Sequence, residues 1–218
     1  MSNISEKELV ELSNKFGYKN LLNRYHMMEN YFDIKEGDTV IDGGAFHGDM
    51  AIYFSKKVGE SGRVISLEPV LNNYLTLCDF LDRNYINNVT PLRIGLWSSR
   101  ERTKFYKSDY PNAGSIRDDF RKVKDDYEII TTDTIDNLAI KLKLNKINFV
   151  WTNIEGCEVE ALKGMKNTLV KDCPDVLMST HRVNDSYSTT NDVIKILESN
   201  GYKTESVKNH KFCIYGHR

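Results

Sequence analysis

The chain has 218 residues, of which 40% are hydrophobic and 28% are charged, and its formal net charge is -1 at pH 7. This balance gives no general attraction to nucleic acid or to an anionic membrane surface, and no run of 18 apolar residues could form a membrane-spanning helix. We therefore expect a cytoplasmic globular protein, large enough to bury a substantial core, with no nucleic-acid partner. The sequence leaves the oligomeric state open.

The four cysteines and five histidines are dispersed along the chain and form no CxxC or HExxH motif. The N-terminal segment alternates charged and apolar residues and has no hydrophobic region typical of a signal peptide. We expect the cysteines to be reduced and mostly buried, and we predict no metal site.

The first 36 residues have helical periodicity. Apolar residues predict one helix near 9–16, ended by Gly17, and a second helix over 21–30. No linker rich in proline or serine separates this region from the rest of the chain. We therefore predict a helical cap over 1–36 on a core of residues 37–218, with a single domain overall.

From residue 38 onward, strand-like and helix-like segments alternate. This pattern predicts a mostly parallel sheet with helices on both faces. Pro91 places the start of the third strand at an edge or irregular position. The last two strands follow each other with no helix between them, which predicts one antiparallel strand at the end of the sheet. We expect seven strands, at 39–42, 63–68, 89–97, 147–152, 175–180, 203–207 and 211–216. The first helix of this region should begin near 50, and further helices should cover 74–81, 135–142, 159–169 and 193–197.

The glycine-rich segment VIDGGAFHGD, residues 40–49, links the first strand to the next helix. A dinucleotide-binding turn begins with glycine, so that backbone N–H groups can approach a pyrophosphate. Here Asp42 stands in that first position, where a carboxylate would repel a pyrophosphate. The pattern favours S-adenosylmethionine, which carries an ammonium and a sulfonium but no phosphate, although a simple tight turn would also have these glycines.

The second strand ends in Glu68, one strand-helix unit after the turn. An acid at this place is suited to accept hydrogen bonds from both ribose hydroxyls of a nucleoside. Asp42 and Glu68 together, at successive strand ends, favour a cofactor site over a purely structural turn.

Four ordered motifs, VIDGGAFHGD, SLEP, TTDTIDNL and INFVWTNIEGCEVEALKGM, closely resemble the FkbM family of S-adenosylmethionine-dependent O-methyltransferases. The resemblance covers roughly residues 38–181. It implies a Rossmann-like class I methyltransferase fold with a seven-stranded sheet and an antiparallel last strand. It also implies that Asp42, Glu68, Asn153 and His181 share the carboxyl edge of the sheet. The predicted cofactor contacts are Asp42, Gly44, Ala45, Gly48, Glu68 and Trp97, the last by stacking on adenine.

The predicted catalytic residues are His181, Glu155 and Asn153. His181 is the best candidate for a general base, because imidazole titrates near neutral pH. Glu155 could act on the acceptor or could instead be a carboxylate stabilised by a helix terminus. Glu158 and Glu160 are expected to be solvated charges. The segment 106–128 lacks periodicity, and we predict either a mobile loop over the acceptor or plain surface.

Two positions depart from the family pattern. Trp151 and Asn153 stand where the family usually has K-x-D, and Ser179 stands where a glutamate usually precedes the histidine. An asparagine has neither the basicity nor the charge of an aspartate, so a non-catalytic relative remains an alternative. We predict an O-methyltransferase acting on a hydroxyl of a small molecule or sugar. A nicotinamide-dependent oxidoreductase is the second alternative, and the acceptor itself cannot be identified from the sequence.

Overall fold

The structure of the chain is a computed structural model that describes residues 7, 10, 11, 14, 31, 34–109, 113–120, 123–208 and 210–218. Most of the predicted N-terminal cap, with its two helices, lies outside the described residues. None of the helices in the described ranges is long and apolar enough to cross a membrane.

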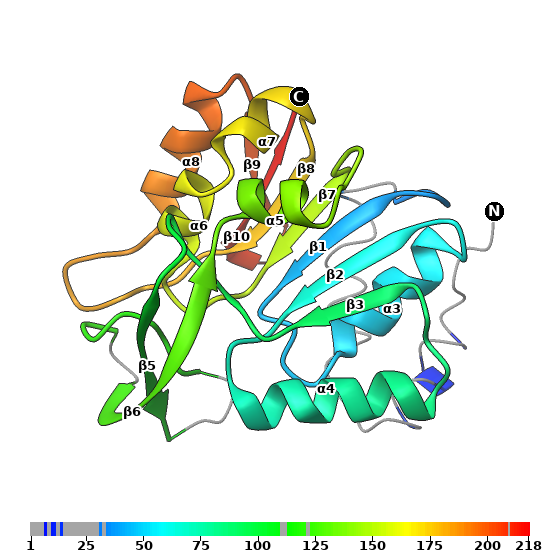
Figure 1. Cartoon of the computed structure of the whole chain (residues 1–218). Helices are drawn as coiled ribbons and strands as arrows, with labels where there is room; N and C mark the ends of the chain where they lie inside the picture. The colour runs from blue at the N-terminus through cyan, green and yellow to red at the C-terminus, as the bar shows by residue number, and fades with distance from the viewer. Residues whose placement is uncertain are drawn as a thin grey trace.

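A seven-stranded sheet forms the centre of the fold (Figure 1). All of its strands are parallel except the last in the chain, which is antiparallel to both of its neighbours. The predicted fold, including the antiparallel last strand and an edge position for the strand containing Pro91, is therefore confirmed. In spatial order the strands are β3 (Val89–Leu92), β2 (Arg63–Leu67), β1 (Thr39–Gly43), β7 (Phe149–Thr152), β8 (Asp175–Ser179), β10 (His210–His217) and β9 (Lys203–Val207).

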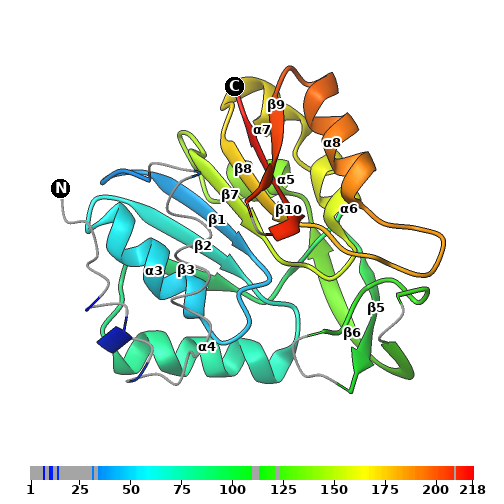
Figure 2. The ribbon, with the colours of Figure 1, turned by 180° about the vertical axis from the view of Figure 1, so that it is seen from behind.

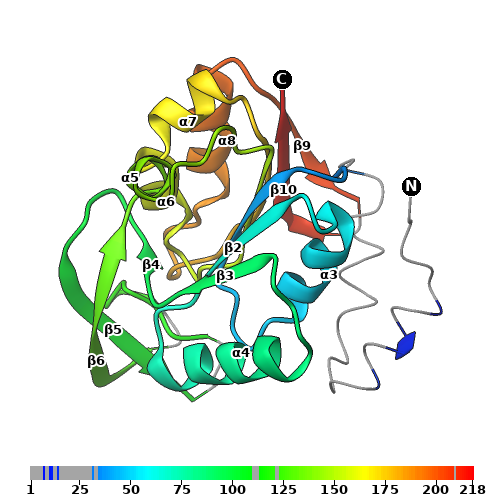
Figure 3. The same ribbon diagram turned by 45° about the vertical axis from the view of Figure 1, so that its right-hand side comes forward.

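Helices cover both faces of this sheet, as the alternating pattern predicts (Figures 1 and 3). Their apolar residues form two separate buried clusters, one on each face. The first face carries α3 (Asp49–Val58) and α4 (Leu71–Arg83), and the second carries α5 (Ile135–Lys141), α6 (Glu158–Lys163), α7 (Lys166–Lys171) and α8 (Thr190–Ser199).

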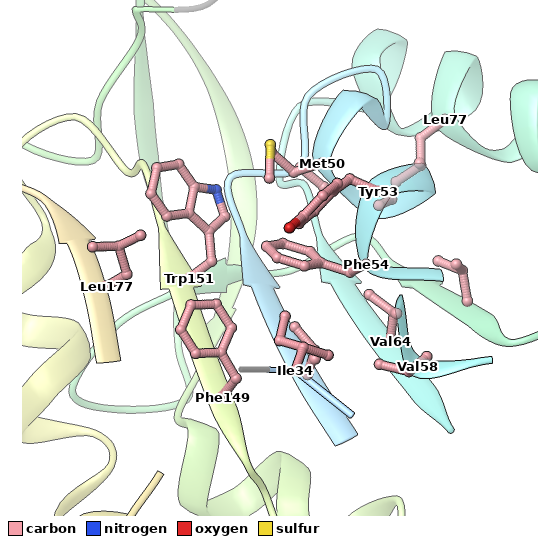
Figure 4. Packing of buried hydrophobic residues seen from close by; sticks show 14 of the residues in the cluster. Ile34, Met50, Tyr53, Phe54, Val58, Val64, Leu77, Phe149, Trp151 and Leu177 are labelled. Carbon is pink, nitrogen blue, oxygen red and sulfur yellow. The ribbon is translucent and has the colours of Figure 1, made fainter. Parts of the chain in front are cut away.

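Aromatic side chains fill the first face of the sheet (Figure 4). Tyr53 and Phe54 of α3 pack over Phe149 and Trp151 of β7, and all four are at most 3% exposed. Trp151, which replaces the lysine of the family pattern, therefore belongs to the core. Burial of four aromatic side chains contributes several kcal/mol, of order 2 kcal/mol each, and fixes α3 and the turn before it.

A second, three-stranded sheet lies beyond the carboxyl ends of the central strands (Figures 1 and 2). It consists of β4 (Gly95–Leu96), β5 (Arg102–Ser108) and β6 (Val123–Asp133), with β5 and β6 paired as an antiparallel hairpin. The segment 106–128, for which we predicted a loop or plain surface, contains the end of β5 and the start of β6, so it is not irregular throughout. Its strands were not recognised because their alternation is masked by charged residues on the exposed face.

Two predicted elements are divided in the structure. The strand expected over 89–97 ends at Leu92, and β4 pairs instead with β6 of the second sheet. The helix expected over 159–169 is interrupted at Gly164, where a Cβ atom would lie 2.3 Å from the carbonyl oxygen of Trp97. At this point the chain passes too close to β4 for any residue with a side chain.

Candidate active site at the carboxyl edge of the sheet

The turn that follows β1, residues 43–48, is held by main-chain hydrogen bonds; we call it the glycine turn. Gly44 has φ +80 and Gly48 has φ +99, both in the left-handed region that favours glycine. A Cβ atom added at Gly44 would lie 2.3 Å from the carbonyl oxygen of Asn153. Glycine is therefore required at 44 by a close approach of the chain after β7 as well as by its dihedral angles.

The N–H groups of the glycine turn are already used within the protein. Gly44 and Ala45 both donate to the carbonyl oxygen of Leu67 at 3.0 Å, and Gly48 donates to Ala45 at 2.8 Å. Phe46 donates to Oε2 of Glu68 at 2.9 Å. A pyrophosphate would need several of these N–H groups directed at it, so the turn is not arranged as a dinucleotide cradle.

Glu68 lies directly after β2 and is only 5% exposed. Besides Phe46, its carboxylate accepts hydrogen bonds from the backbone N–H of Val70 at 3.0 Å and from Nδ2 of Asn73 at 3.2 Å. Burial raises the pKa of Glu68, and these hydrogen bonds partly offset that rise. The carboxylate is fixed in one orientation at the wall of a cavity, where its remaining lone pairs can accept hydrogen bonds from a ligand.

The space between the walls of this cavity, including the part open to solvent, is about 750 Å³. It lies where β1, β2 and β7 end and is closed on one side by the second sheet. The described residues that line it include two glutamates but no lysine, arginine or histidine. They are Gly44, Phe46, Leu67, Glu68, Pro69, Val70, Asn73, Ile94, Gly95, Leu96, Phe105, Gly114, Ile116, Asn153, Ile154, Glu155 and Cys157.

Asn153 and Glu155 reach the cavity from the turn after β7. The backbone N–H of Asn153 donates to Gly43 at 2.9 Å, whereas its side-chain amide forms no hydrogen bond with any residue that the structure describes. Glu155 has φ +48, a left-handed conformation unusual for a residue with a side chain. The hydroxyl of Ser115 donates to the carbonyl oxygen of Glu155 at 2.7 Å, which fixes this turn to the loop of the β5–β6 hairpin.

Behind Glu155, His181 lies between two glutamates, two residues after the end of β8. Its Nδ1 is 2.7 Å from Oε1 of Glu158, and its Nε2 is 3.5 Å from Oε1 of Glu155. Burial alone would lower the pKa of His181, but the hydrogen bonds and charges of Glu155 and Glu158 outweigh it and raise that pKa to about 9. We call Glu155, Glu158, His181 and Thr189 the Glu–His cluster.

The predicted site residues fall into two groups. Four of them, Gly44, Glu68, Asn153 and Glu155, line the cavity, and His181 contacts Glu155. The cavity lining does not include the other four predicted residues, which are Asp42, Ala45, Gly48 and Trp97.

The positions of these four residues have structural explanations. Asp42 is fully buried within β1 and accepts a hydrogen bond from Ser66 at 2.9 Å. Ala45 belongs to the apolar cluster under α3. A Cβ atom at Gly48 would lie 2.7 Å from Leu77 of α4, so this glycine permits close helix packing. Trp97 is half-buried, and its backbone N–H donates to Asp133.

Glu158 is the site residue that the sequence analysis placed wrongly. It is fully buried, whereas Glu160, two residues later, forms an ion pair with Lys163 and keeps 21% of its side chain exposed. No local signal in the sequence marks Glu158, because its burial depends on contacts with His181 and Thr189 of the loop between β8 and α8. Among the described residues, no group of three or more His, Cys, Asp or Glu side chains is arranged to hold a metal ion.

Comparison with known proteins agrees with this fold. A family model described as the methyltransferase FkbM domain matches residues 42–204. The chain belongs to the FkbM methyltransferase family. No curated protein matches the sequence significantly.

Several solved structures share the fold at low sequence identity. The FkbM methyltransferase from Methylobacillus flagellatus has 20% identity and a TM-score of 0.56, and the match covers 90% of this chain but 52% of that one. The chain thus spans about half the length of that relative. A SAM-dependent methyltransferase from Aquifex aeolicus has 15% identity and a TM-score of 0.54, with 99% and 98% of the two chains covered. Aeropyrum pernix fibrillarin, solved with bound S-adenosyl-L-methionine, has 14% identity and a TM-score of 0.54, with 85% and 68% covered.

The FkbM family is a family of S-adenosylmethionine-dependent methyltransferases, so S-adenosylmethionine is the cofactor with which the cavity has to be compared. The cavity fits its chemistry. The buried carboxylate of Glu68 has lone pairs that can accept hydrogen bonds from the ribose diol. At Gly44 the close approach of the chain after β7 leaves the cavity wall without a side chain. The described turn has no set of N–H groups directed at a phosphate.

Proposed function

We propose that this methyltransferase transfers the methyl group of S-adenosylmethionine to a hydroxyl oxygen of a small molecule or sugar. The observation that carries the proposal is the presence of Glu68 and Glu155 in the lining of one cavity, on either side of the end of β1. Adjacent strands lie about 4.8 Å apart, so β2 and β7, on either side of β1, are separated by roughly 10 Å. The two carboxylates therefore reach the cavity from different strand ends, which allows one to hold the nucleoside while the other faces the acceptor.

On this proposal Glu68 and the glycine turn hold the cofactor, with Glu68 accepting hydrogen bonds from the ribose hydroxyls. The other predicted turn residues, Asp42, Ala45 and Gly48, support the turn from the core without contacting the ligand. When bound, S-adenosylmethionine supplies an activated methyl group, which an acceptor oxygen takes by in-line displacement.

Glu155 and Asn153 act on the acceptor. Glu155 accepts the proton that the hydroxyl loses as the new O–C bond forms, and the Asn153 amide orients the same hydroxyl. The raised pKa of His181 favours its protonated form at neutral pH. The proposal therefore assigns the acceptance of the proton to Glu155, and it gives His181 the role of holding the Glu155 carboxylate.

The composition of the cavity wall limits the acceptor. Its described lining contains Phe105, Ile116 and other apolar groups near Glu155 but no cationic side chain. Apart from the His181 ring behind Glu155, a phosphate or carboxylate on the acceptor would meet no counter-charge in this described lining and would lie beside a carboxylate, which is unfavourable. We infer that the part of the acceptor near the reacting hydroxyl is uncharged.

The hydrogen bonds of the glycine turn argue against a nicotinamide cofactor, because the N–H groups of Gly44, Ala45, Phe46 and Gly48 have protein acceptors. The alternative of a non-catalytic relative is disfavoured by the Glu–His cluster, which places a buried ion pair and an unusual backbone conformation at the cavity wall.

The first test is calorimetry with S-adenosylmethionine, S-adenosylhomocysteine and NAD. We expect the first two to bind and NAD not to bind. Formation of S-adenosylhomocysteine is then measured with neutral sugars, phenols and aliphatic alcohols, and with amines and phosphorylated sugars for comparison. Turnover with a neutral hydroxyl compound is expected, and Glu155→Gln should lower kcat by about 100-fold or more without weakening cofactor binding. Turnover only with amines, or full activity of Glu155→Gln, would contradict the proposal.

A further inference from the structure

Glu158 is a fully buried carboxylate at the first position of α6, with three hydrogen-bond partners. Its Oε1 lies 2.7 Å from Nδ1 of His181 and accepts from the backbone N–H of Gly156 at 3.0 Å. Its Oε2 accepts from the hydroxyl of Thr189 at 2.8 Å. A carboxylate without exposure to water is retained only when hydrogen bonds and an opposite charge compensate its desolvation, and the three partners supply both.

Thr189 links the same carboxylate to the backbone of His181. Its Oγ1 accepts a hydrogen bond from the backbone N–H of His181 at 2.9 Å while it donates to Glu158. The two ends of the loop from β8 to α8 are therefore joined by a hydrogen bond beside the imidazole. The ring of His181 cannot rotate without breaking its bond to Glu158, and Glu158 cannot move without breaking its bond to Thr189.

The second nitrogen of His181 is directed at Glu155. The Nε2–Oε1 distance of 3.5 Å is longer than the Nδ1 contact to Glu158, so Glu158 holds the ring and the ring presents an N–H to Glu155. Phe120 also lies beside the ring, edge to face with 6.1 Å between the ring centroids, and carries no charge. Within the part of the chain that the structure describes, the charged groups that act on the pKa of His181 are Glu155 and Glu158.

We propose that Glu158 and Thr189 are positioning residues for the reaction: they fix His181 as an imidazolium, which in turn fixes the Glu155 carboxylate that faces the acceptor. The role of Glu155 in this arrangement rests on the proposed function, whereas the effect of Glu158 on His181 does not. Glu158 does not line the cavity, so it acts through His181 and not on a ligand.

The deciding variant is Glu158→Gln, which keeps the size of the side chain and removes its charge. The His181 ring is titrated by NMR in the full chain and assigned with His181→Asn. We expect the His181 pKa to fall by one unit or more in Glu158→Gln, because one of its two anionic partners is lost. Glu160→Gln, the same change on the outer side of the same helix, should leave it unchanged.

Kinetics separate positioning from a merely structural role. In Glu158→Gln we expect kcat to fall by about 10-fold or more, with KM for S-adenosylmethionine unchanged, and the alkaline limb of the kcat–pH profile to move to lower pH together with the His181 pKa. Thr189→Val should lower kcat in the same direction and Thr189→Ser should restore it. If Glu158→Gln does not fold, the two Thr189 variants test the positioning role instead.

The outcomes distinguish the two proposals. An unchanged His181 pKa in Glu158→Gln, or equal effects of Glu158→Gln and Glu160→Gln, would overturn the positioning role even if the wild type is an active methyltransferase. Absence of methyl transfer by the wild type would instead contradict the proposed function. In that case the His181 titration still decides whether Glu158 fixes the imidazolium.

Discussion

The glycine turn and Glu155 of the Glu–His cluster line the same cavity, but the turn and the cluster are held in place by different forces. The turn is fixed by main-chain contacts between neighbouring strands, such as the two N–H groups that donate to Leu67. The cluster is fixed by side chains: Glu158 bonds Thr189, 31 residues away, and the hydroxyl of Ser115 reaches the backbone of Glu155, 40 residues away.

This difference predicts how each region responds to change. Main-chain hydrogen bonds survive most substitutions, so the glycine turn should be sensitive only where a new Cβ atom collides with the backbone. The Glu–His cluster depends on charge, so conservative substitutions and pH should alter it while the fold remains. In the proposed function, the first region holds the cofactor and the second adjusts the chemistry beside it.

The largest effect is expected at Gly44. In Gly44→Ala the left-handed conformation costs about 1–2 kcal/mol, and the collision with the Asn153 carbonyl oxygen, at 2.3 Å, adds about 1–3 kcal/mol. We expect a large loss in the free energy of unfolding and no detectable binding of S-adenosylmethionine. Denaturant unfolding and calorimetry measure both.

Gly201→Ala is the matched control for this prediction. Gly201 has the same φ of +80, but its added Cβ atom would meet only the end of the Arg218 side chain at 3.0 Å, and that side chain can move. The control should lose about 1–2 kcal/mol of stability and retain cofactor binding. Equal losses in the two variants would show that the approach of Asn153 is unimportant.

A smaller effect is expected at Glu68. Glu68→Gln retains only one acceptor oxygen, so one of its donors, such as the backbone N–H of Phe46, would face an amide N–H. We expect a loss of about 2 kcal/mol in stability and a 10- to 100-fold loss of affinity for S-adenosylmethionine. The exposed residue Glu60 provides the control, Glu60→Gln, which should behave as the wild type. Unchanged affinity in Glu68→Gln would remove this carboxylate from the ligand site.

The fold was predictable because its signals are local in the sequence. Alternating strands and helices predicted the parallel sheet, and the two final strands predicted its antiparallel member. Glu68 was found because it stands at a strand end, one strand-helix unit after the glycine turn. The β5–β6 hairpin was missed because one face of it is charged and exposed, which hides the alternation of a strand.

The candidate site was only partly predictable because it joins distant segments. Nothing local distinguishes Glu158, which is fully buried, from Glu160, which pairs with Lys163 near the surface. Only the position of the β8–α8 loop, with His181 and Thr189, makes one of them a buried partner. The predicted role of Asp42 as a ligand contact remains untested. Its complete burial in β1 points instead to support of the strand end from within the core.

The smallest predicted effect is a change of stability with pH that originates in the Glu–His cluster. The pKa of His181 is raised in the folded protein from 6.5 to about 9. The protonated ring therefore contributes its full stabilisation below pH 6.5, and this contribution is lost as the pH rises through 9. For a side chain 15% exposed, we expect about 1–2 kcal/mol once solvent screening is allowed for.

The free energy of unfolding should be measured between pH 6 and pH 10 for the wild type and for His181→Asn. Thiols and tyrosines also titrate above pH 8, and they affect both proteins alike, so the difference between the two curves isolates the histidine. The difference should be largest near pH 6 and vanish near pH 10. Glu60→Gln, at an exposed position of another part of the chain, should show a difference from the wild type that is independent of pH over this range. A flat difference for His181→Asn as well would mean that the cluster is held by packing, as the glycine turn is held by its main chain, and not by charge.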